Sequence, residues 1–171
     1  MMNKPDASEY DPYYENYVSL VRDGDINSTL AVQPAELRKA FGELGEDKGA
    51  FAYAPGKWTI KEMLGHLIDG ERMFAYRAFR ISRGDRTPIE GFEQDGYIEN
   101  ARSNERSFAD MLDEFELLRV ANTLMFNHMS DADAARFGIA NGVEISVRAL
   151  AYIMAGHVAH HVNILNERYL V

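Results

Sequence analysis

Apolar residues recur every three to four positions through four long stretches of the chain, residues 25–45, 59–83, 107–129 and 146–165. This spacing is the period of an amphipathic α-helix with one buried face. Few segments alternate apolar and polar residues as a half-buried strand does, and Asn141-Gly142 signals a tight turn, the tip of a small hairpin. The pattern predicts an all-α chain folded as a four-helix bundle.

Residues suited to helix ends flank these stretches. Thr59 and Glu62 have the spacing of a capping box, in which each side chain binds a free backbone N–H of the first turn. Gly84 follows the last apolar position of the same stretch, as a C-terminal glycine does. Ser107 and Ser146 are of the type that begins a helix. The sequence therefore sets the start of the second, third and fourth helices.

The first stretch contains Pro34, which removes one backbone hydrogen bond from a helix. The apolar face keeps its register across Pro34, so we expect one kinked helix rather than two. Gly45 is the expected end of this helix. Residues 84–106 form a long connection rich in glycine, proline and acidic residues, and connections of that length are often functional. We expect a single domain over 1–171, with residues 1–24 as an extension whose tyrosines cover an edge of the core.

Three histidines are placed to meet on the predicted core face. His157 and His161 are four residues apart and therefore share one side of a helix, and His66 lies on the second helix. Alternatively, His66 is a histidine at the core edge with a hydrogen-bond partner, and the other two belong to a polar strip. Two unpaired imidazoles buried side by side would be costly, however, and a bound cation removes that cost. His160 and His128 lie off this pattern, and we expect neither to be a ligand.

Three imidazoles without a thiolate suit zinc, nickel, copper or iron(II). Three protein ligands leave a coordination position open, which is the arrangement of catalytic zinc. Asp69 follows His66 by one helical turn, where it could orient a ligand imidazole or accept a proton; the alternative is a solvated carboxylate.

Composition removes several classes of function. The formal net charge of −9 argues against a nucleic-acid partner, which needs clustered lysine and arginine. The chain has no cysteine, so disulfides, cysteine-ligated zinc and a thiol nucleophile on the protein are excluded. No apolar run approaches the roughly 20 residues of a membrane span, and no signal peptide is visible. We therefore expect a cytoplasmic protein without a membrane partner.

Two motifs resemble those of a known family. Residues 56–69 read GKWTIKEMLGHLID and residues 156–169 read GHVAHHVNILNERY. Together they are similar to the motifs of the DinB-like (YfiT-like, DinB_2) superfamily, over about residues 15–170. The resemblance implies an up-down-down-up four-helix bundle, often a homodimer, with one divalent ion, nickel or zinc, on His66, His157 and His161. It also implies kinship to thiol transferases that use bacillithiol or mycothiol, and to maleylpyruvate isomerase.

Two functional hypotheses follow. The first is a metal-dependent enzyme acting on a small molecule, by transfer of a low-molecular-weight thiol or by hydrolysis. Its candidate substrate-binding residues are Arg77, Gln94 and Tyr97, for which the alternative roles are surface salt bridges and loop packing. The alternative is a non-catalytic metal-binding module with a stress-response or structural role. An open coordination position in a cleft would favour the enzyme, and a closed four-ligand site would favour the module.

Overall fold

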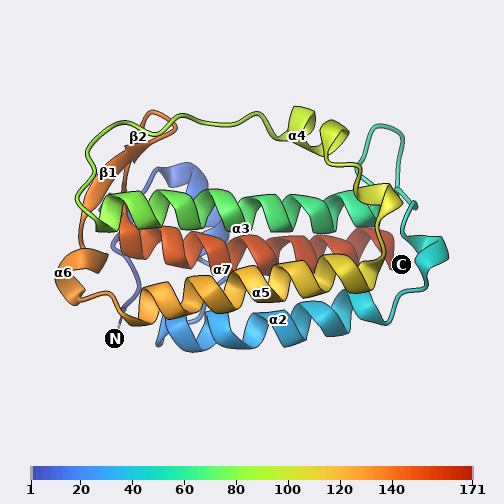
Figure 1. Ribbon diagram of the computed structural model, residues 1–171, viewed down its shortest axis with the longest axis horizontal. Helices are drawn as coiled ribbons and strands as arrows, with labels where there is room; N and C mark the ends of the chain where they lie inside the picture. Colours follow the sequence, from blue (N-terminus) through green and yellow to red (C-terminus); the bar gives the residue numbers. More distant parts are fainter. Residues whose placement is uncertain (1, 171) are drawn as a thin grey trace.

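The computed structural model describes residues 2–170, and four long helices run side by side along its longest dimension (Figure 1). They are α2 (Ile26–Gly42), α3 (Ile60–Ser82), α5 (Phe108–Asn127) and α7 (Val147–Ile164). Helices α2 and α7 run in one direction and α3 and α5 in the other. Each packs on two neighbours, α3 on α5 and α7, and α2 on α5 and α7. The predicted up-down-down-up four-helix bundle is confirmed.

This topology explains the long connection before α5. Because α3 and α5 are parallel, the chain must return along the whole length of α3, roughly 35 Å for a helix of this size. Residues 83–107 make that return along one side of the bundle (Figure 1) and carry the short helix α4 (Gln94–Asn100). The long connection is thus a structural necessity, and it also places a segment across the middle of α3.

Smaller elements close the two ends of the bundle. After α5 come α6 (Asp131–Ala134) and an antiparallel hairpin of β1 (Phe137–Ala140) and β2 (Val143–Ser146). The hairpin turns at Asn141 and Gly142, whose φ angles of 54° and 77° lie in the left-handed region that such turns require. The remaining short helical pieces are η1 (Ala7–Glu9), η2 (Pro12–Tyr14), α1 (Glu15–Val18), η3 (Glu46–Lys48), η4 (Ser103–Glu105) and η5 (Leu165–Tyr169).

The predicted helix starts are observed. Thr59 and Glu62 form both hydrogen bonds of the capping box at α3. The Ser107 side chain accepts a hydrogen bond from the backbone N–H of Asp110, and Ser146 accepts one from Ala149. These bonds satisfy N–H groups that the first turn of a helix leaves free.

Helix α2 passes through Pro34 without a break, but it ends earlier than predicted. Pro34 leaves the carbonyl of Leu30 without its helical donor, and the guanidinium of Arg119 on α5 donates to that oxygen over 3.5 Å. Gly45 does not end the helix: α2 stops at Gly42, and Gly45, with φ −66°, precedes η3 instead. Its backbone is in a conformation open to any residue, so glycine is not needed there.

The N-terminal segment packs along α7. Val18 and Val21 are buried, and the backbone of Gly156 approaches the carbonyl of Tyr17 so closely that a Cβ at Gly156 would lie 2.1 Å from that oxygen. Because α1 covers α7 on one side while α2 and α3 flank it, α7 is buried almost all the way round.

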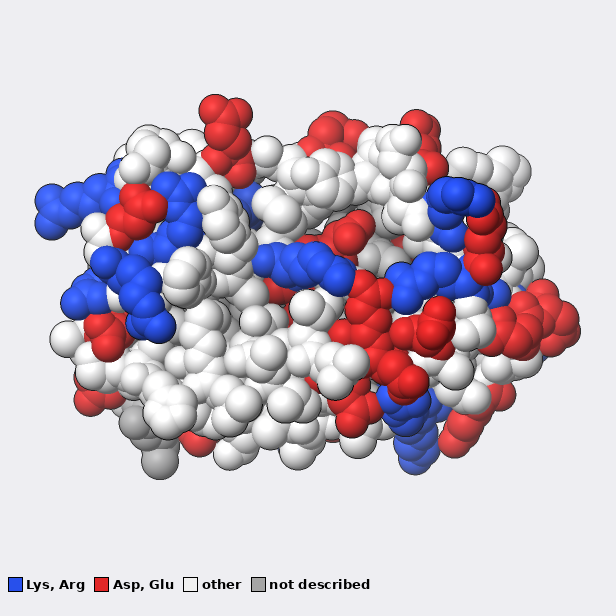
Figure 2. All heavy atoms as spheres, in the orientation of Figure 1, with Lys and Arg blue, Asp and Glu red and all other residues white. Residues whose placement is uncertain are grey.

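Charged side chains of both signs are mixed over the face shown in Figure 2. Lysines and arginines gather toward the left end of this face, with acidic side chains among them. Among the described residues, none of the helices combines the length and the apolar character needed to cross a membrane.

Candidate metal centre and cavity

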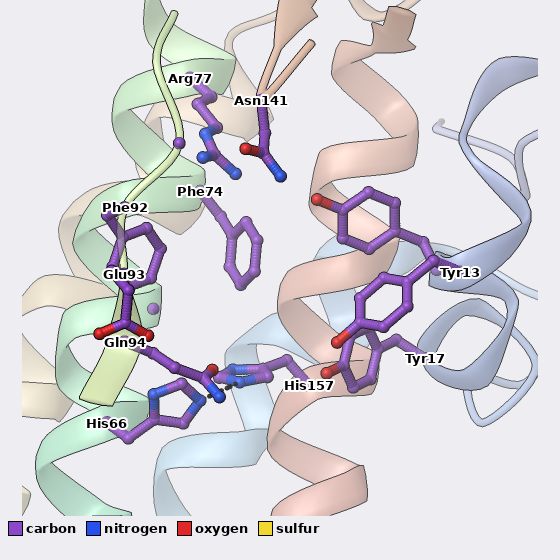
Figure 3. A pocket seen from close by; sticks show the side chains of 13 residues that line it. Tyr13, Tyr17, His66, Phe74, Arg77, Phe92, Glu93, Gln94, Asn141 and His157 are labelled. Carbon is purple, nitrogen blue, oxygen red and sulfur yellow. Dashed lines mark hydrogen bonds between the residues drawn. The ribbon is translucent and has the colours of Figure 1, made fainter. Parts of the chain in front are cut away.

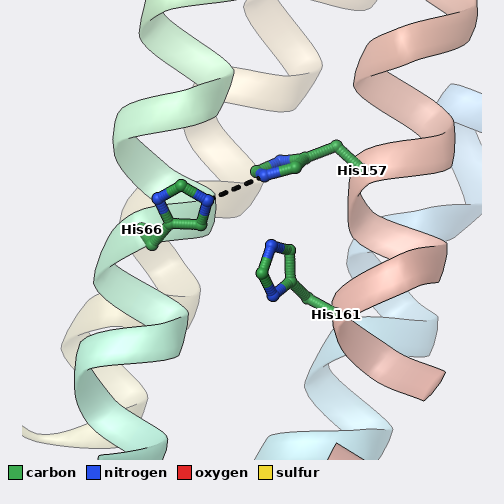
Figure 4. Close-up of side chains that lie close together, drawn as sticks. All are labelled: His66, His157 and His161. Atoms are coloured by element: carbon green, nitrogen blue, oxygen red, sulfur yellow. Dashed lines mark hydrogen bonds between the residues drawn. The ribbon is translucent and has the colours of Figure 1, made fainter. Parts of the chain in front are cut away.

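His66, His157 and His161 point toward one another across the contact between α3 and α7 (Figure 4). Helix α7 supplies two of them because residues four apart stack on one face. Helix α3 supplies the third because it packs directly on α7. The structure therefore brings together the three histidines that the sequence singled out.

The three rings form a tight, enclosed group. Nε2 of His66 lies 2.9 Å from Nε2 of His157, and one nitrogen from each of the three rings lies within 4.8 Å of the others. All three side chains are buried, with residue exposures of 5%, 4% and 7% for His66, His157 and His161. Nitrogens this close can all contact a single ion.

Burial keeps these imidazoles neutral. It lowers the pKa of His66 to about 4 and that of His161 to about 3, and it holds the pKa of His157 well below its usual value, with the neighbouring histidines adding to each shift. A neutral imidazole has the free nitrogen lone pair that a metal needs. The group is thus in its ligand form over the whole physiological pH range.

One observation within the group favours a cation. Nδ1 of His161 is buried and has no hydrogen-bond partner, and a buried nitrogen without a partner is costly. Coordination fixes the ring and offsets such costs, and three imidazoles are a donor set that divalent transition metals accept. The residues therefore fit a divalent ion.

Aromatic residues surround the histidines, and sequence reasoning missed most of them. The ring of Trp58 lies 4.7 Å from that of His66, Phe74 lies 5.5 Å from His157, and Tyr17 also lies 5.5 Å from His157, measured between centroids. Trp58 stands within the quoted motif and so carried a signal. Tyr17 carried none, because nothing in its local sequence shows that the N-terminal segment folds back onto α7.

The other two histidines stand apart from the group. His160 is partly exposed and packs edge-on against Tyr17 at a centroid distance of 5.3 Å. His128 is exposed at the end of α5. Neither contributes a nitrogen to the cluster.

A cavity of about 540 Å³ opens beside His66 and His157 (Figure 3). Its walls come from the N-terminal segment, α3, the crossover connection and the hairpin turn. A smaller cavity of about 310 Å³ is lined in part by His161, and Gln94 lines both cavities. The histidines are therefore accessible from space large enough for a small molecule.

The remaining predicted site residues occupy different surroundings. Arg77 and Gln94 line the larger cavity, whereas Tyr97 is largely exposed and packs on Phe92 at 5.0 Å. Asp69 lines neither of the two cavities at the histidines. Burial raises its pKa, and the charges acting on it come from Arg72 and Glu114. Its role toward a ligand imidazole or a proton stays a prediction.

Comparison with known proteins points to one family. The sequence profile of the DinB superfamily matches residues 29–165. Among solved structures, YfiT from Bacillus subtilis, described as a probable metal-dependent hydrolase with an unusual four-helix bundle topology, superposes with a TM-score of 0.77 at 18% identity. The superposition covers 98% of this chain and 91% of that one, so the whole fold is shared. No curated protein matches the sequence significantly.

Proposed function

The chain belongs to the DinB superfamily, and on this premise we propose that it is a metal-dependent hydrolase of a small molecule, with His66, His157 and His161 as the ligands of one divalent ion. The observation that carries the proposal is the convergence of three buried, neutral imidazoles beside a cavity of about 540 Å³. The shared fold with YfiT, described as a probable metal-dependent hydrolase, supports hydrolysis as the reaction.

When bound, a divalent ion supplies Lewis-acid polarisation and lowers the pKa of water. In hydrolysis, the hydroxyl of water bonds to the electrophilic atom of the substrate, the bond from that atom to the leaving group breaks, and the remaining proton of water goes to the leaving group. The chain's own contribution is to hold the imidazoles neutral and to enclose the substrate between aromatic walls. Burial, followed by the hydrogen bond with Tyr13, raises the pKa of Tyr17, so its hydroxyl stays neutral at the wall of the cavity.

Nickel or zinc is the proposed ion: imidazole nitrogens suit both, as they also suit copper and iron(II), and the family resemblance favours these two. Gln94 is a proposed substrate contact, since its amide reaches both cavities. Tyr97 is proposed only for the outer mouth, because it is exposed. Asp69 is proposed as a positioning carboxylate, one turn from His66.

Thiol transfer at the same ion is the second candidate. The chain has no cysteine, so a thiol would have to arrive as a substrate, and the cavity has room for one. A cation lowers the pKa of a thiol that it contacts and so favours the reactive thiolate.

Metal analysis and an activity screen test these proposals together. Purified full-length protein should carry about one nickel or zinc per chain, and His157→Ala should lose most of it, whereas His128→Ala, at an exposed histidine, should retain it.

The metal-loaded protein should hydrolyse members of a panel of esters, amides and lactones, and His157→Ala should not. Full metal content in His157→Ala contradicts the site. A loaded protein that transfers a thiol instead favours the second candidate, and one inactive in both assays favours the non-catalytic module.

A further inference from the structure

Arg77 is a buried cation without a counter-charge. Its residue exposure is 3%, and Nε of its guanidinium is buried without a hydrogen-bond partner. Its side-chain partner is the hydroxyl of Tyr14, whose pKa burial raises, so this partner is neutral. Among the residues that the structure describes, no carboxylate pairs with Arg77. A charge buried in this way is costly unless something else compensates it.

Arg119, another buried arginine, shows how the fold compensates a buried positive charge. Arg119 is fully buried, and its Nε and Nη2 each donate to the carboxylate of Glu71 over 2.8 Å. Gln33 accepts a further bond from Nη1. Among the described residues, the fold thus gives the Arg119 guanidinium a carboxylate that accepts two hydrogen bonds, and it gives the Arg77 guanidinium no carboxylate.

The unpaired guanidinium faces the cavity that contains the histidines. Arg77 lies on α3 three turns after His66, about 16 Å along the helix axis. Side chains on a helix lean toward its N-terminus, and Figure 3 shows the Arg77 side chain extending into the cavity in this direction. The guanidinium and the histidines therefore occupy opposite ends of one space.

Asn141 completes the Arg77 end of the cavity. It sits at the hairpin turn with φ 54°, and its side chain projects beside the guanidinium (Figure 3). Its position is fixed by Gly91 of the crossover, where a Cβ would lie 2.1 Å from Oδ1 of Asn141. An amide held there can donate an N–H to an anion that the guanidinium binds.

The charge in the cavity selects the kind of anion. Arg77 is the one cationic side chain among the lining residues, and Glu93 adds a carboxylate whose oxygens accept bonds from the backbone N–H groups of Asp95 and Gly96. One guanidinium offsets the charge of a monoanion, whereas a phosphate dianion would need further donors and would also be repelled by the Glu93 carboxylate. A planar carboxylate also fits the two-pronged geometry of arginine.

We propose that the substrate of this cavity is a small organic acid, whose carboxylate is bound by Arg77 and Asn141 while the bond to be hydrolysed faces His66 and His157. The rings of Phe74, Phe92 and Tyr17 line the space between the two ends, so the body of this acid is apolar or aromatic. This inference rests on the proposed function for the reaction, but the acid-binding end is independent of the metal.

Calorimetric titration of the full-length, chelator-treated protein tests the acid-binding end. The probes are 4-phenylbutyrate, its neutral amide, and 3-phenylpropyl phosphate. The wild-type protein should bind the acid at least tenfold more tightly than the amide and more tightly than the phosphate. Arg77→Met should lose this preference. Arg77→Lys keeps the positive charge but not the two parallel N–H donors of the guanidinium, so it should retain only part of the preference.

Several outcomes would overturn the proposal: acid binding no tighter than amide binding in the wild type, including no binding of either; a preference that survives in Arg77→Met; or tighter binding of the phosphate.

Arg77→Met should also melt at the same temperature as the wild type or higher, because it removes an uncompensated charge. A marked fall would mean that Arg77 has a structural partner, against the proposal. An acid preference that persists in a metal-free His157→Ala variant would show that this end stands even if the proposed metal site fails.

Discussion

At the scale of single residues, Gly70 has a specific role beside the three clustered histidines. It lies inside α3, where glycine costs roughly 1 kcal/mol relative to alanine. A Cβ at this position would lie 2.8 Å from Cε1 and 3.0 Å from Nδ1 of His157. The absence of a side chain at Gly70 is therefore what lets the His157 ring take its place between the two helices.

We accordingly expect Gly70→Ala to displace His157 and to weaken metal binding by about tenfold or more, the scale on which groups that orient metal ligands act. Helix propensity partly offsets the strain, so the free energy of unfolding should change by no more than about 1–2 kcal/mol. Metal titration with a competing chelator measures the first effect. Gly42→Ala is the control, because a Cβ there meets ordinary contacts at 3.7 Å. Unchanged affinity in Gly70→Ala would show that the ring does not depend on this space.

At the scale of elements, the N-terminal segment matters because it forms one wall of the cavity. Its attachment includes Glu9 in η1, whose carboxylate is buried and accepts a bond of 2.6 Å from Nε of Arg148 on α7. A second oxygen accepts from Nη2 of the same arginine. The pair holds the start of the chain against α7, so that Tyr13 and Tyr17, a few residues later, face the histidines.

The same pair gives a pH dependence of known sign. Burial raises the pKa of Glu9, but the bonds from Arg148 and from the backbone of Asp6 outweigh it and leave the pKa below the usual value of 4.5. A lowered folded-state pKa means that the stabilisation is present above about pH 4.5 and is lost as the pH falls below it. Glu9→Gln should therefore cost about 1–2 kcal/mol at pH 7, and this difference from the wild type should shrink below about pH 4.

Urea unfolding at pH 7, 5 and 3.5 measures this difference. Glu36→Gln, at an exposed carboxylate on α2, should match the wild type at each pH. A Glu9→Gln penalty that stays constant down to pH 3.5 would mean that ionisation of Glu9 does not contribute.

At the scale of the whole molecule, one buried polar network joins all four long helices. Arg119 of α5 binds Glu71 of α3 and Gln33 of α2, and Gln33 donates to the backbone carbonyl of Ala155 on α7 over 2.8 Å. Asn122 adds a further bond to Glu71. A network with defined partners in four helices sets how they are aligned relative to one another.

Arg119→Met should destabilise the fold by about 3–5 kcal/mol, because it leaves the Glu71 carboxylate buried without its partner. The double variant Arg119→Met/Glu71→Leu removes both charges and should recover most of that loss. Chemical denaturation of the wild type, both single variants and the double variant completes the cycle. Additive losses in the double variant would contradict direct coupling between the two residues.

Local sequence was enough to predict the four long helices and to single out His66, His157 and His161, which meet between α3 and α7. The helix starts at Thr59, Ser107 and Ser146 depend on hydrogen bonds between residues three apart, and the residue types that form them are visible in the sequence. The spacing of His157 and His161 is equally local. The end of α2 was predicted wrongly at Gly45, because a glycine marks a helix end only where the backbone is left-handed. The homodimer, the cytoplasmic location and the identity of the metal stay predictions.

Only the tertiary structure decided what surrounds the histidines. Tyr17, Arg77 and Asn141 come from three separate parts of the chain, and they share one cavity because α1 folds onto α7 and the crossover connection runs back over α3. Likewise, no local pattern distinguishes Arg119, which has a buried carboxylate partner, from Arg77, which has no carboxylate partner among residues 2–170. Periodicity and capping depend on residues that are neighbours in the sequence. The partners of a buried charge depend instead on how the helices pack, and the unpaired guanidinium of Arg77 is the feature from which the substrate class is inferred.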